Sequence, residues 1–511
     1  MTTPGELGSR GSVRILAALL LVSVTCSVLH AISRPLWNDE IITVIVADQP
    51  SLRNIWRALA DAADTNPPAF YVAARIAHWF VADDHLAHRL PSIAGLALAL
   101  TCVFLFLSRR VSKLSALVGA TFLLVTPLSE YAYEARPYAL MIACLAAAMM
   151  FWQRLEDSSW HALPLAVALA TSISLHYYAV LAWPAFVVAE GAVLLRRRFR
   201  LHAWLAIVAA ATPFMIFAPL LVTLREFYGQ NYWARTSLAQ GLVVHDWLFL
   251  GQGHWGSTLT AGLSLALVYW ISGRTYRLAA PVTSANSPPV VPTEEYVLVL
   301  MFLWMPAIAV TLPLVSGAGL TERHFLPATL GGALAIGLLV ARLGPAIRAA
   351  LLALFMSSYL YSSHHEIGFA WKGRLLEQRR AKTADIERMV TAAPGADGLL
   401  VVSSALEYLE AAYFAPSQIR SRLHWLSDPN AAVRFSGSAS PDLALLRLQH
   451  WMPLQVEDYA DFAAKHRDFV LVGGKGVFSD WWPQRLLHDG HRLQVFAFTT
   501  GRTIYKVTLQ P

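Results

Sequence analysis

The sequence predicts an α-helical protein that crosses a membrane several times and carries a small α/β domain at its C-terminal end. Hydrophobic residues make up 56% of the 511 positions and charged residues only 14%, whereas soluble proteins carry charge at about a quarter of their positions. Long apolar runs fill the chain up to residue 362, and the part after it is far more polar. We therefore expect a transmembrane domain over 1–362 and an extracytoplasmic domain over 363–511.

About eleven apolar runs are long enough to cross roughly 30 Å of hydrocarbon. They lie near 15–32, 90–107, 113–128, 138–152, 162–175, 179–195, 203–224, 256–272, 296–315, 325–341 and 347–361. The first run has no small-residue cleavage site before Arg34, so we expect a retained helix and not a cleaved signal peptide.

Basic residues are enriched in one set of loops, as at 109–113 and 196–200, and not in the longer loops of the other set. The positive-inside rule then places the N-terminus in the cytoplasm. It also makes the segments 33–89, 129–137, 176–178, 225–255, 316–324 and the tail from 363 external. The net charge of +7 follows from this loop bias and does not indicate a nucleic-acid partner. We read the three cysteines as packing residues inside apolar runs.

The first external loop is too long for a simple connection and shows helical patterns over 52–62 and 69–80. Trp56 and Trp79 suit the headgroup level, so we expect these helices to lie at the membrane interface. In the tail, the patterns predict helices near 371–393 and 405–414. They also predict strands at 399–403 and 469–472 and a hairpin of 495–499 with 503–509.

Two adjacent carboxylates follow the first apolar run. Asp39 and Glu40 end a short polar loop that starts at Arg34, and charge at a membrane edge is costly and usually functional. A partly desolvated carboxylate can take the proton that a hydroxyl or amine nucleophile loses as it attacks. The pair could also bind a divalent cation, and the structural alternative is a helix end that faces water.

A second polar stretch, 64–71, contains two consecutive prolines that pre-set the start of a helix. Asp64 or Asn66 as the cap of that helix is the simpler interpretation. In the functional alternative, Asp64 lies beside Asp39 at the membrane face.

Three further external segments carry isolated cations. Arg136 is the only basic residue of its loop, and a guanidinium at the outer interface suits a phosphate oxyanion; the alternative is a surface ion pair with Glu134. Arg323 offers the same chemistry, whereas Arg89 could simply anchor a helix end. His176 interrupts an apolar run, where a lone histidine is usually structural.

The strongest functional signal is that these polar motifs all lie on one side of the membrane. Acids, arginines and histidines from at least four loops all face outward in the predicted topology. Glycine-rich phosphate loops, metal-binding Cys/His spacings and Ser-His-Asp arrangements are not recognisable in the sequence. The pattern therefore favours an enzyme that works at the outer membrane surface.

These motifs resemble, in their order, those of the protein mannosyltransferase-like or ArnT-like group of C-type membrane glycosyltransferases. The resemblance covers about 10–345, and the polar tail is similar to that of bacterial members. It rests on the segments Pro35–Glu40, Asn66–Tyr71, Arg89–Ser92, Glu134–Tyr138, His176–Tyr177 and Glu322–Pro327. The chain departs from the group at Asn66, where histidine is common, and at His324, where tyrosine is more usual.

The resemblance implies a GT-C fold and inverting transfer of a hexose or pentose from a polyprenyl-phosphate donor. The acceptor would be a lipid, a glycan or a protein, and the site would face outward from a bacterial inner membrane. By motif match, Asp39 would be the catalytic base, Glu40 would support it or a metal ion, Asp64 would shape the acceptor side and Arg136 would face the donor phosphate. The remaining motif residues would contact substrate: Asn66, Tyr71, Arg89, Glu134, Tyr138, His176, Tyr177, Glu322 and Arg323.

A transporter or flippase of lipid-linked sugars is the alternative function. It should place charged residues near the bilayer midplane and show repeat symmetry, but here the charges gather at one face and no repeat is apparent. A membrane scaffold with an external binding tail would explain the tail without explaining the clustered acids.

Overall fold

The computed structural model describes residues 9–229, 234, 237–249, 255–277, 291–311, 319–393, 398–473, 480–499 and 501–510. It divides into two compact units. The first comprises Met1–Ala31, Ile76–Phe217 and Thr236–Gly373, and the second comprises Ile32–Arg75, Ala218–Arg235 and Arg374–Pro511. We call them the helical unit and the sheet unit. The sheet unit thus takes in most of the first external loop, while the predicted domain boundary at 362/363 stays a prediction. The stretch 281–293 is rich in Pro, Ser and Thr, which predicts a flexible cytoplasmic linker, and it lies mostly outside the described residues.

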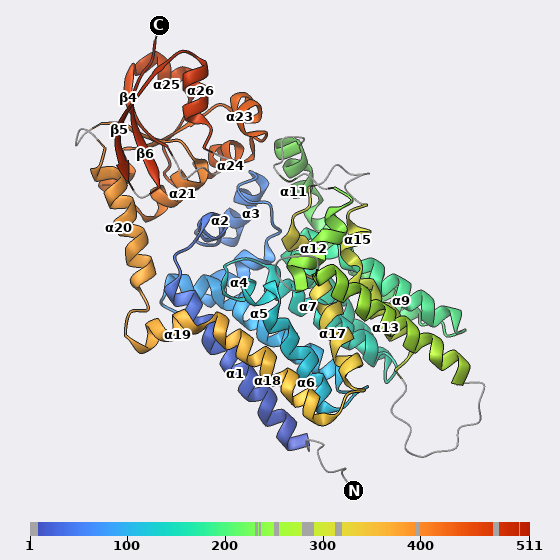
Figure 1. Ribbon diagram of the computed structural model, residues 1–511. Coiled ribbons are helices and arrows are strands. Elements are labelled where there is room, and N and C mark those ends of the chain that lie inside the picture. Colours follow the sequence, from blue (N-terminus) through green and yellow to red (C-terminus); the bar gives the residue numbers. More distant parts are fainter. Residues whose placement is uncertain are drawn as a thin grey trace. The chain divides into compact units, whose positions relative to one another are not determined.

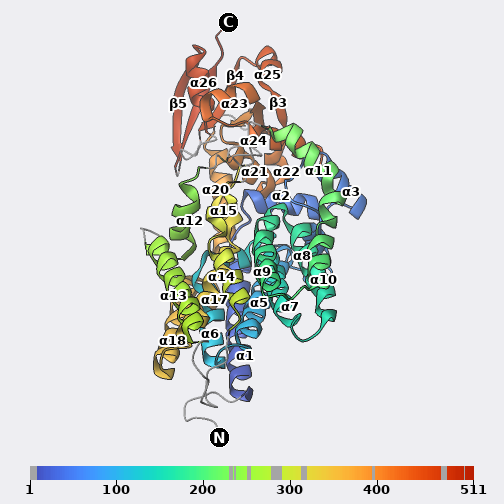
Figure 2. The same cartoon turned by 90° about the vertical axis from the view of Figure 1, so that its right-hand side faces the viewer.

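The helical unit is a bundle of apolar helices. Its longer members are most of α1 (Ser9–Ser33), α5 (Asp84–Leu107), α6 (Lys113–Phe122), α7 (Tyr138–Arg154), α8 (Ala162–Leu175), α9 (Trp183–Leu195), α10 (Leu201–Ala209), part of α11 (Thr212–Tyr228), α12 (Gln240–Phe249), α13 (Trp255–Arg277), α14 (Thr293–Leu303), α17 (Ala328–Val340) and α18 (Pro345–Ser362). Helix α5 packs on α7, α7 on α8, and α6 on α17 (Figures 1 and 2). At Gly95 the helix backbones come so close that a Cβ would meet Leu140 Cα at 2.6 Å.

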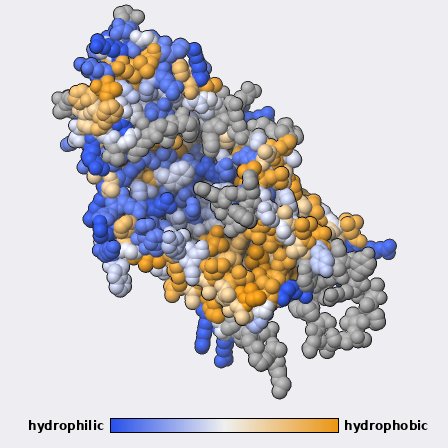
Figure 3. Space-filling view, in the orientation of Figure 1, coloured by the Kyte–Doolittle hydropathy of each residue, from blue (hydrophilic) through white to orange (hydrophobic). Residues whose placement is uncertain are grey.

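Four helices in the described residues are long and apolar enough to span a membrane: Arg10–Ser33, Asp84–Leu107, Tyr177–Leu195 and Leu201–Tyr228. A fifth span results if Lys113–Val125 and Pro127–Tyr133, which meet at 70°, count as one. Shorter apolar helices cover four more predicted runs: Tyr138–Arg154, Ser159–Leu175, Gly256–Tyr269 and Ala328–Val340. The chain is therefore a multi-span membrane protein, and hydrophobic side chains cover the face around α13 and α17 in Figure 3.

The predicted run 296–315 is not one helix. Helix α14 ends at Leu303. After a single intervening residue, Trp304, the short α15 (Met305–Ala309) starts with a proline in its first turn. Proline lacks the N–H that a continuous helix requires and fits best at a helix start, which explains the break at this point.

The sheet unit contains a six-stranded mixed sheet in the order β3-β2-β1-β4-β6-β5. Strand β1 (Leu400–Val402) runs parallel to β2 (Leu423–Ser427) and β4 (Asp468–Gly473), and β3 (Val456–Asp458) adds to β2. The antiparallel pair β5 (Arg492–Thr499) and β6 (Arg502–Thr508) completes it as the predicted hairpin. Helix α20 (Glu377–Thr391) precedes the first strand. The helices between the strands are α21 (Ala405–Phe414), α22 (Ser417–Arg420), α23 (Pro429–Ser436), α24 (Ser440–Leu448), α25 (Tyr459–Lys465) and α26 (Trp482–His488). The helix predicted near 371–393 is confirmed as α20, and a separate helix, α19 (His364–Trp371), precedes it in the chain.

Three short helices occupy the first external loop: α2 (Asn38–Ala47), α3 (Leu52–Ala60) and α4 (Ala69–Ala77). The last two confirm the helices expected over 52–62 and 69–80. The polar loop expected around Asp39 and Glu40 is wrong, because both residues lie in the first turn of α2. Carboxylates at a helix N-terminus are stabilised by the positive end of its dipole, so an acidic pair here starts a helix.

Candidate functional site

Arg136 lies at a bend of the helical unit, just before α7 begins at Tyr138. Pro137 ends the bend with a helical φ of −71°, as suits proline at a helix start. The hydroxyl of Ser92 on α5 donates to the backbone carbonyl of Arg136 at 2.8 Å and fixes the bend to the bundle. Arg136 is only 4% exposed, so it lies buried in the bundle and not at its surface.

His176 lies where the chain passes from α8 to the 3-10 helix Tyr177–Ala182. It is 5% exposed, and its ring centroid lies 5.1 Å from that of Tyr138 and 5.4 Å from that of His324. The motifs that contain Tyr138 and His324 thus meet at His176.

The third motif joins them through the short 3-10 helix Glu322–Phe325. The Arg323 guanidinium lies over the Tyr138 ring at 5.9 Å from its centroid, and the His324 ring lies 4.2 Å from that of Tyr178. The Tyr178 hydroxyl donates to the carbonyl of Gly319 at 2.9 Å and holds the segment before this helix. We call Arg136, Tyr138, His176, Arg323 and His324 the arginine–histidine cluster.

Electrostatics keep both imidazoles of the cluster neutral. Burial, together with the charges of Arg136 and Arg323, lowers the pKa of His176 to about 3. Burial, the neighbouring His176 and the same two arginines hold the pKa of His324 well below its usual value. At neutral pH the permanent positive charge of the cluster therefore resides on the two guanidinium groups.

The backbone also selects the tautomer of each imidazole. The N–H of Tyr178 donates to Nδ1 of His176 at 3.2 Å, and the N–H of Thr321 donates to Nδ1 of His324 at 3.0 Å. Because Nδ1 accepts in both rings, the ring proton of each neutral imidazole is on Nε2. The cluster thus combines two guanidinium groups with two Nε2–H donors, a set suited to an anion.

The other motif residues of the helical unit occupy different surroundings. Arg89 is 1% exposed and donates to the carbonyl of Ala31 at 2.7 Å, so it ties α5 to the end of α1. Tyr177 and Glu134 are half-buried, and Glu322 is exposed. Their expected substrate contacts stay predictions.

In the sheet unit, the acidic pair belongs to what we call the carboxylate loop, residues 36–71. Glu40 is fully buried, and its carboxylate accepts the backbone N–H of Trp37 at 3.3 Å, closing the first turn of α2. Asp39 is half-buried, and its backbone carbonyl accepts from the Thr43 hydroxyl at 3.0 Å. The two neighbours therefore differ: the Glu40 carboxylate is built into the helix start, whereas Asp39 is a half-buried residue.

Asp64 and Tyr71 form a buried pair within the same loop. The Tyr71 hydroxyl donates to Asp64 Oδ2 at 2.7 Å, and the Thr65 N–H donates to Oδ1 at 2.6 Å. Asp64 is thus bound to a side chain inside the helix that follows it. Asn66 is 4% exposed, and its buried Nδ2 has no hydrogen-bond partner among the described residues.

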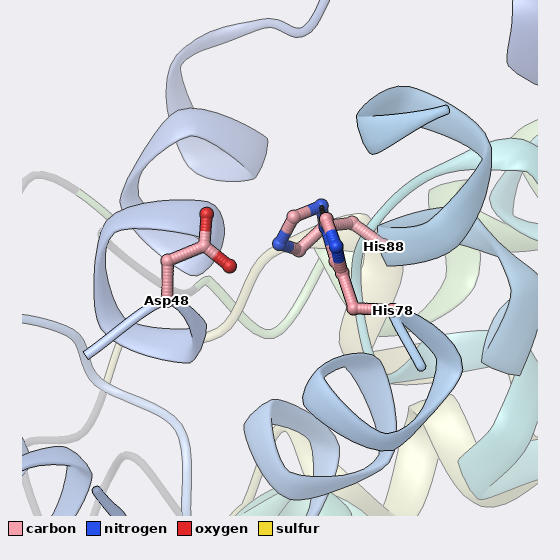
Figure 4. Close-up of side chains that lie close together, drawn as sticks. All are labelled: Asp48, His78 and His88. Atoms are coloured by element: carbon pink, nitrogen blue, oxygen red, sulfur yellow. Dashed lines mark hydrogen bonds between the residues drawn. The ribbon is translucent and has the colours of Figure 1, made fainter. Parts of the chain in front are cut away.

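Asp39 and Glu40 fit a divalent cation poorly. The Glu40 carboxylate is buried and committed to the Trp37 N–H, and no third His, Cys, Asp or Glu completes a ligand group around the pair in the described part of the chain. Imidazoles do gather elsewhere, in the helical unit: His78 Nε2 lies 3.2 Å from Nδ1 of the fully buried His88 (Figure 4). His88 Nδ1 also lies 2.7 Å from the Asp84 carbonyl. Asp48, drawn in the same figure, belongs to the sheet unit.

Solved structures provide the decisive likeness. ArnT from Cupriavidus metallidurans bound to undecaprenyl phosphate matches with a TM-score of 0.57 at 13% identity, over 98% of each chain. Its apo state matches with a TM-score of 0.53 at 15% identity, again over 98% of each chain. The chain has the ArnT fold.

An oligosaccharyltransferase from Archaeoglobus fulgidus, crystallised with zinc and sulfate, shares 11% identity over 89% of this chain and 67% of its own, and its TM-score of 0.45 is too low to bear on the fold. No protein-family model matches the sequence, and no curated protein does. The ArnT fold is thus shown by structure alone.

Sequence reasoning misses part of the arginine–histidine cluster. In the sequence, His324 is only a departure from the motif of the resembling group. Tyr178, which contacts it, belongs to the predicted external turn 176–178 and has no expected role. Each follows an Arg or a His–Tyr pair in a short external segment, but only the fold brings 176–178 against 321–324. The His78–His88 pair likewise gives no recognisable ligand spacing.

Proposed function

We propose that the protein is an integral membrane glycosyltransferase. It transfers a sugar, with inversion, from a polyprenyl-phosphate donor to a lipid, glycan or protein acceptor. The observation that carries the proposal is the arginine–histidine cluster, which assembles two guanidinium groups and two neutral imidazole donors inside a unit made of apolar helices. An anion with a long apolar tail is the ligand that such surroundings suit.

The chemistry of the cluster matches the needs of the leaving group. When the bond from the sugar to the phosphate breaks, negative charge develops on the phosphate and must be stabilised in place. Arg136 and Arg323 keep their charge at any physiological pH. Neutral Nε2–H groups of His176 and His324 add hydrogen bonds without titrating in that range.

Asp39 is the proposed base. Inversion requires the acceptor to attack the face of the anomeric carbon opposite the departing phosphate, so the proton must be taken by a group separate from the arginines. A half-buried carboxylate at a helix start can accept it. We assign Glu40 the task of building the first turn of α2, and the pair Asp64–Tyr71 that of shaping the acceptor side. The poor fit of the acidic pair to a metal ion favours a mechanism without one at this position.

The remaining features of the proposal concern placement. We infer that the shorter apolar helices complete a bundle of about eleven spans, with the basic loops in the cytoplasm. The site and the C-terminal sheet would then face outward from a bacterial inner membrane.

Binding of undecaprenyl phosphate to the purified protein tests the proposed role of the arginine–histidine cluster directly. Arg136→Ala and Arg323→Ala should each raise its Kd about tenfold or more, because each removes charge-assisted hydrogen bonds to the phosphate. Arg380→Ala is the matched control, since Arg380 is an exposed arginine of α20 outside the cluster.

An unaltered Kd in both cluster variants would sink the phosphate assignment, and absence of binding to the unmodified protein would sink the proposed donor class. Comparing the surface glycans, lipids and glycoproteins of a deletion strain with those of its parent would then identify the sugar and acceptor. Export of a lipid-linked sugar without transfer would instead favour the flippase.

A further inference from the structure

Asn38, the first residue of α2, holds a side-chain amide in a fixed orientation. It directly precedes Asp39 and is 8% exposed. Its Nδ2 donates to Glu410 Oε1 at 3.3 Å, whereas its buried Oδ1 has no hydrogen-bond partner among the described residues. A buried acceptor left without a donor destabilises the folded protein. Such an atom therefore calls for an explanation, and a ligand is one.

Glu410 determines which way the Asn38 amide points. It lies on α21 in the same sheet unit, and Lys382 on α20 forms an ion pair with its other carboxylate oxygen. An ionised carboxylate can only accept hydrogen bonds, so Asn38 must turn its NH₂ group toward Glu410. The opposite orientation would place two oxygens against each other. The ion pair with Lys382 holds the Glu410 carboxylate in place, and the Asn38 oxygen is thereby directed away from it.

A second set of contacts from the C-terminal part of the chain holds the same loop. Asp61, at the end of α3, accepts from Arg447 at 3.2 Å, from His450 at 2.8 Å and from the indole N–H of Trp451 at 3.0 Å. The C-terminal residues of the sheet unit therefore contact the carboxylate loop at Asn38, at Gln49 and at Asp61, which lies three residues before Asp64.

We propose that Asn38 Oδ1 accepts a hydrogen bond from a hydroxyl or ammonium group of the sugar substrate, and that Glu410 is the positioning residue for this contact. The inference rests on the proposed function and assigns the sugar, not the phosphate, to the Asn38 side. On the same loop, the buried Nδ2 of Asn66 is a donor without a partner among the described residues. A sugar hydroxyl can donate to an oxygen such as Asn38 Oδ1 or accept from an amide such as that of Asn66.

The test separates the sugar contact from the phosphate contact. Binding of undecaprenyl phosphate, which has no sugar, is measured for Asn38→Ala and Glu410→Ala beside transfer from undecaprenyl-phosphate-linked hexoses and pentoses. Membranes of a deletion strain supply the acceptor. Both variants should bind the sugar-free carrier like the unmodified protein and should lose about tenfold in kcat/KM for transfer. Varying donor and acceptor separately shows which KM carries the loss, and hence which sugar Asn38 contacts.

Glu410→Gln and the double variant distinguish positioning from mere stability. The amide oxygen that Glu410→Gln introduces can still accept from Asn38, so this variant should lower Tm by losing the Lys382 ion pair but recover most of the turnover. Asn38→Ala with Glu410→Ala should be no slower than Asn38→Ala alone, because the second change acts through the first. Glu387→Gln, at an exposed acid of α20, is the control.

Unchanged turnover in Asn38→Ala would overturn the inference. So would a Glu410→Gln variant as slow as Glu410→Ala, or fully additive losses. If the unmodified protein fails to bind undecaprenyl phosphate, the proposed function fails first, which keeps the two results distinct. Should Glu410→Ala not fold, Asn38→Ala and Glu410→Gln still decide between the outcomes.

Discussion

The arginine–histidine cluster and the carboxylate loop bring charged side chains together in different ways. The cluster collects buried and half-buried side chains from three segments separated by up to 188 positions, 136 to 324, and the fold must be complete before they meet. The carboxylate loop places Asp39 and Glu40 on successive residues of one helix start and braces them with contacts from α21 and α24. The arginine–histidine cluster therefore depends on how the bundle packs, whereas the acidic pair Asp39–Glu40 depends on a local turn.

The difference follows from the cost of burial. A guanidinium keeps its charge even when its surroundings are desolvated, so the cluster can lie deep among aromatic rings. A carboxylate that must accept a proton needs some access to water or substrate, and a helix N-terminus stabilises its charged form at the surface. The half-buried state of Asp39 beside the fully buried Glu40 reflects this division.

Asp39→Asn should produce the largest effect and separates the two regions most sharply. The amide has nearly the same shape but cannot take a proton, so transfer from the lipid-linked sugar should fall about 10²- to 10⁴-fold. Binding of undecaprenyl phosphate should remain that of the unmodified protein, because the arginines are untouched. The measurement pairs a transfer assay with a Kd for the carrier, and Glu387→Gln is the exposed-acid control. Retained transfer would remove Asp39 from its role as base.

The contrast also explains what the sequence can predict. The motifs carrying Arg136, His176 and Arg323 are recognisable one by one, and their common side of the membrane indicates a shared site. Their actual contacts, such as Arg323 over the Tyr138 ring, depend on how the bundle packs and have no local signature. The short helices α3 and α4 are predictable because their apolar periodicity is local.

Other elements escape prediction for equally physical reasons. The five-residue β2 and three-residue β3 are too short to show a strand period. Helix α2 is missed because its acidic start looks like a loop. The hydrogen bond from Asn38 to Glu410 spans 372 positions in the chain, and the sequence around either residue does not predict it.

Glu40→Gln gives a smaller effect and asks whether the two adjacent acids share one role. Glutamine keeps an oxygen for the Trp37 N–H but loses the charge at the helix N-terminus, which costs about 0.3–1 kcal/mol. We expect an apparent Tm lower by a few degrees and transfer within about twofold of the unmodified protein, a change too small for a lost catalytic group. A loss of transfer as deep as that of Asp39→Asn, with sensitivity to chelators, would instead make Glu40 a metal ligand.

Asp442→Asn gives the smallest effect and compares Asp39 with an acid that the same unit buries without a proposed role. Burial, with the nearby charge of Asp428, raises the pKa of Asp442 from 3.8 to about 7. Because the folded-state pKa is the higher one, the contribution of Asp442 to stability is complete below about pH 4 and disappears as the pH rises through about 7. The apparent Tm of the unmodified protein should therefore fall between about pH 4 and 7 more steeply than that of Asp442→Asn, whose amide does not titrate. Transfer activity should not differ at about pH 6, where the unmodified side chain is mostly neutral like the amide. Equal pH slopes would mean that Asp442 is charged in the folded protein, and the contrast between a silent buried acid and the working Asp39 would lose its physical basis.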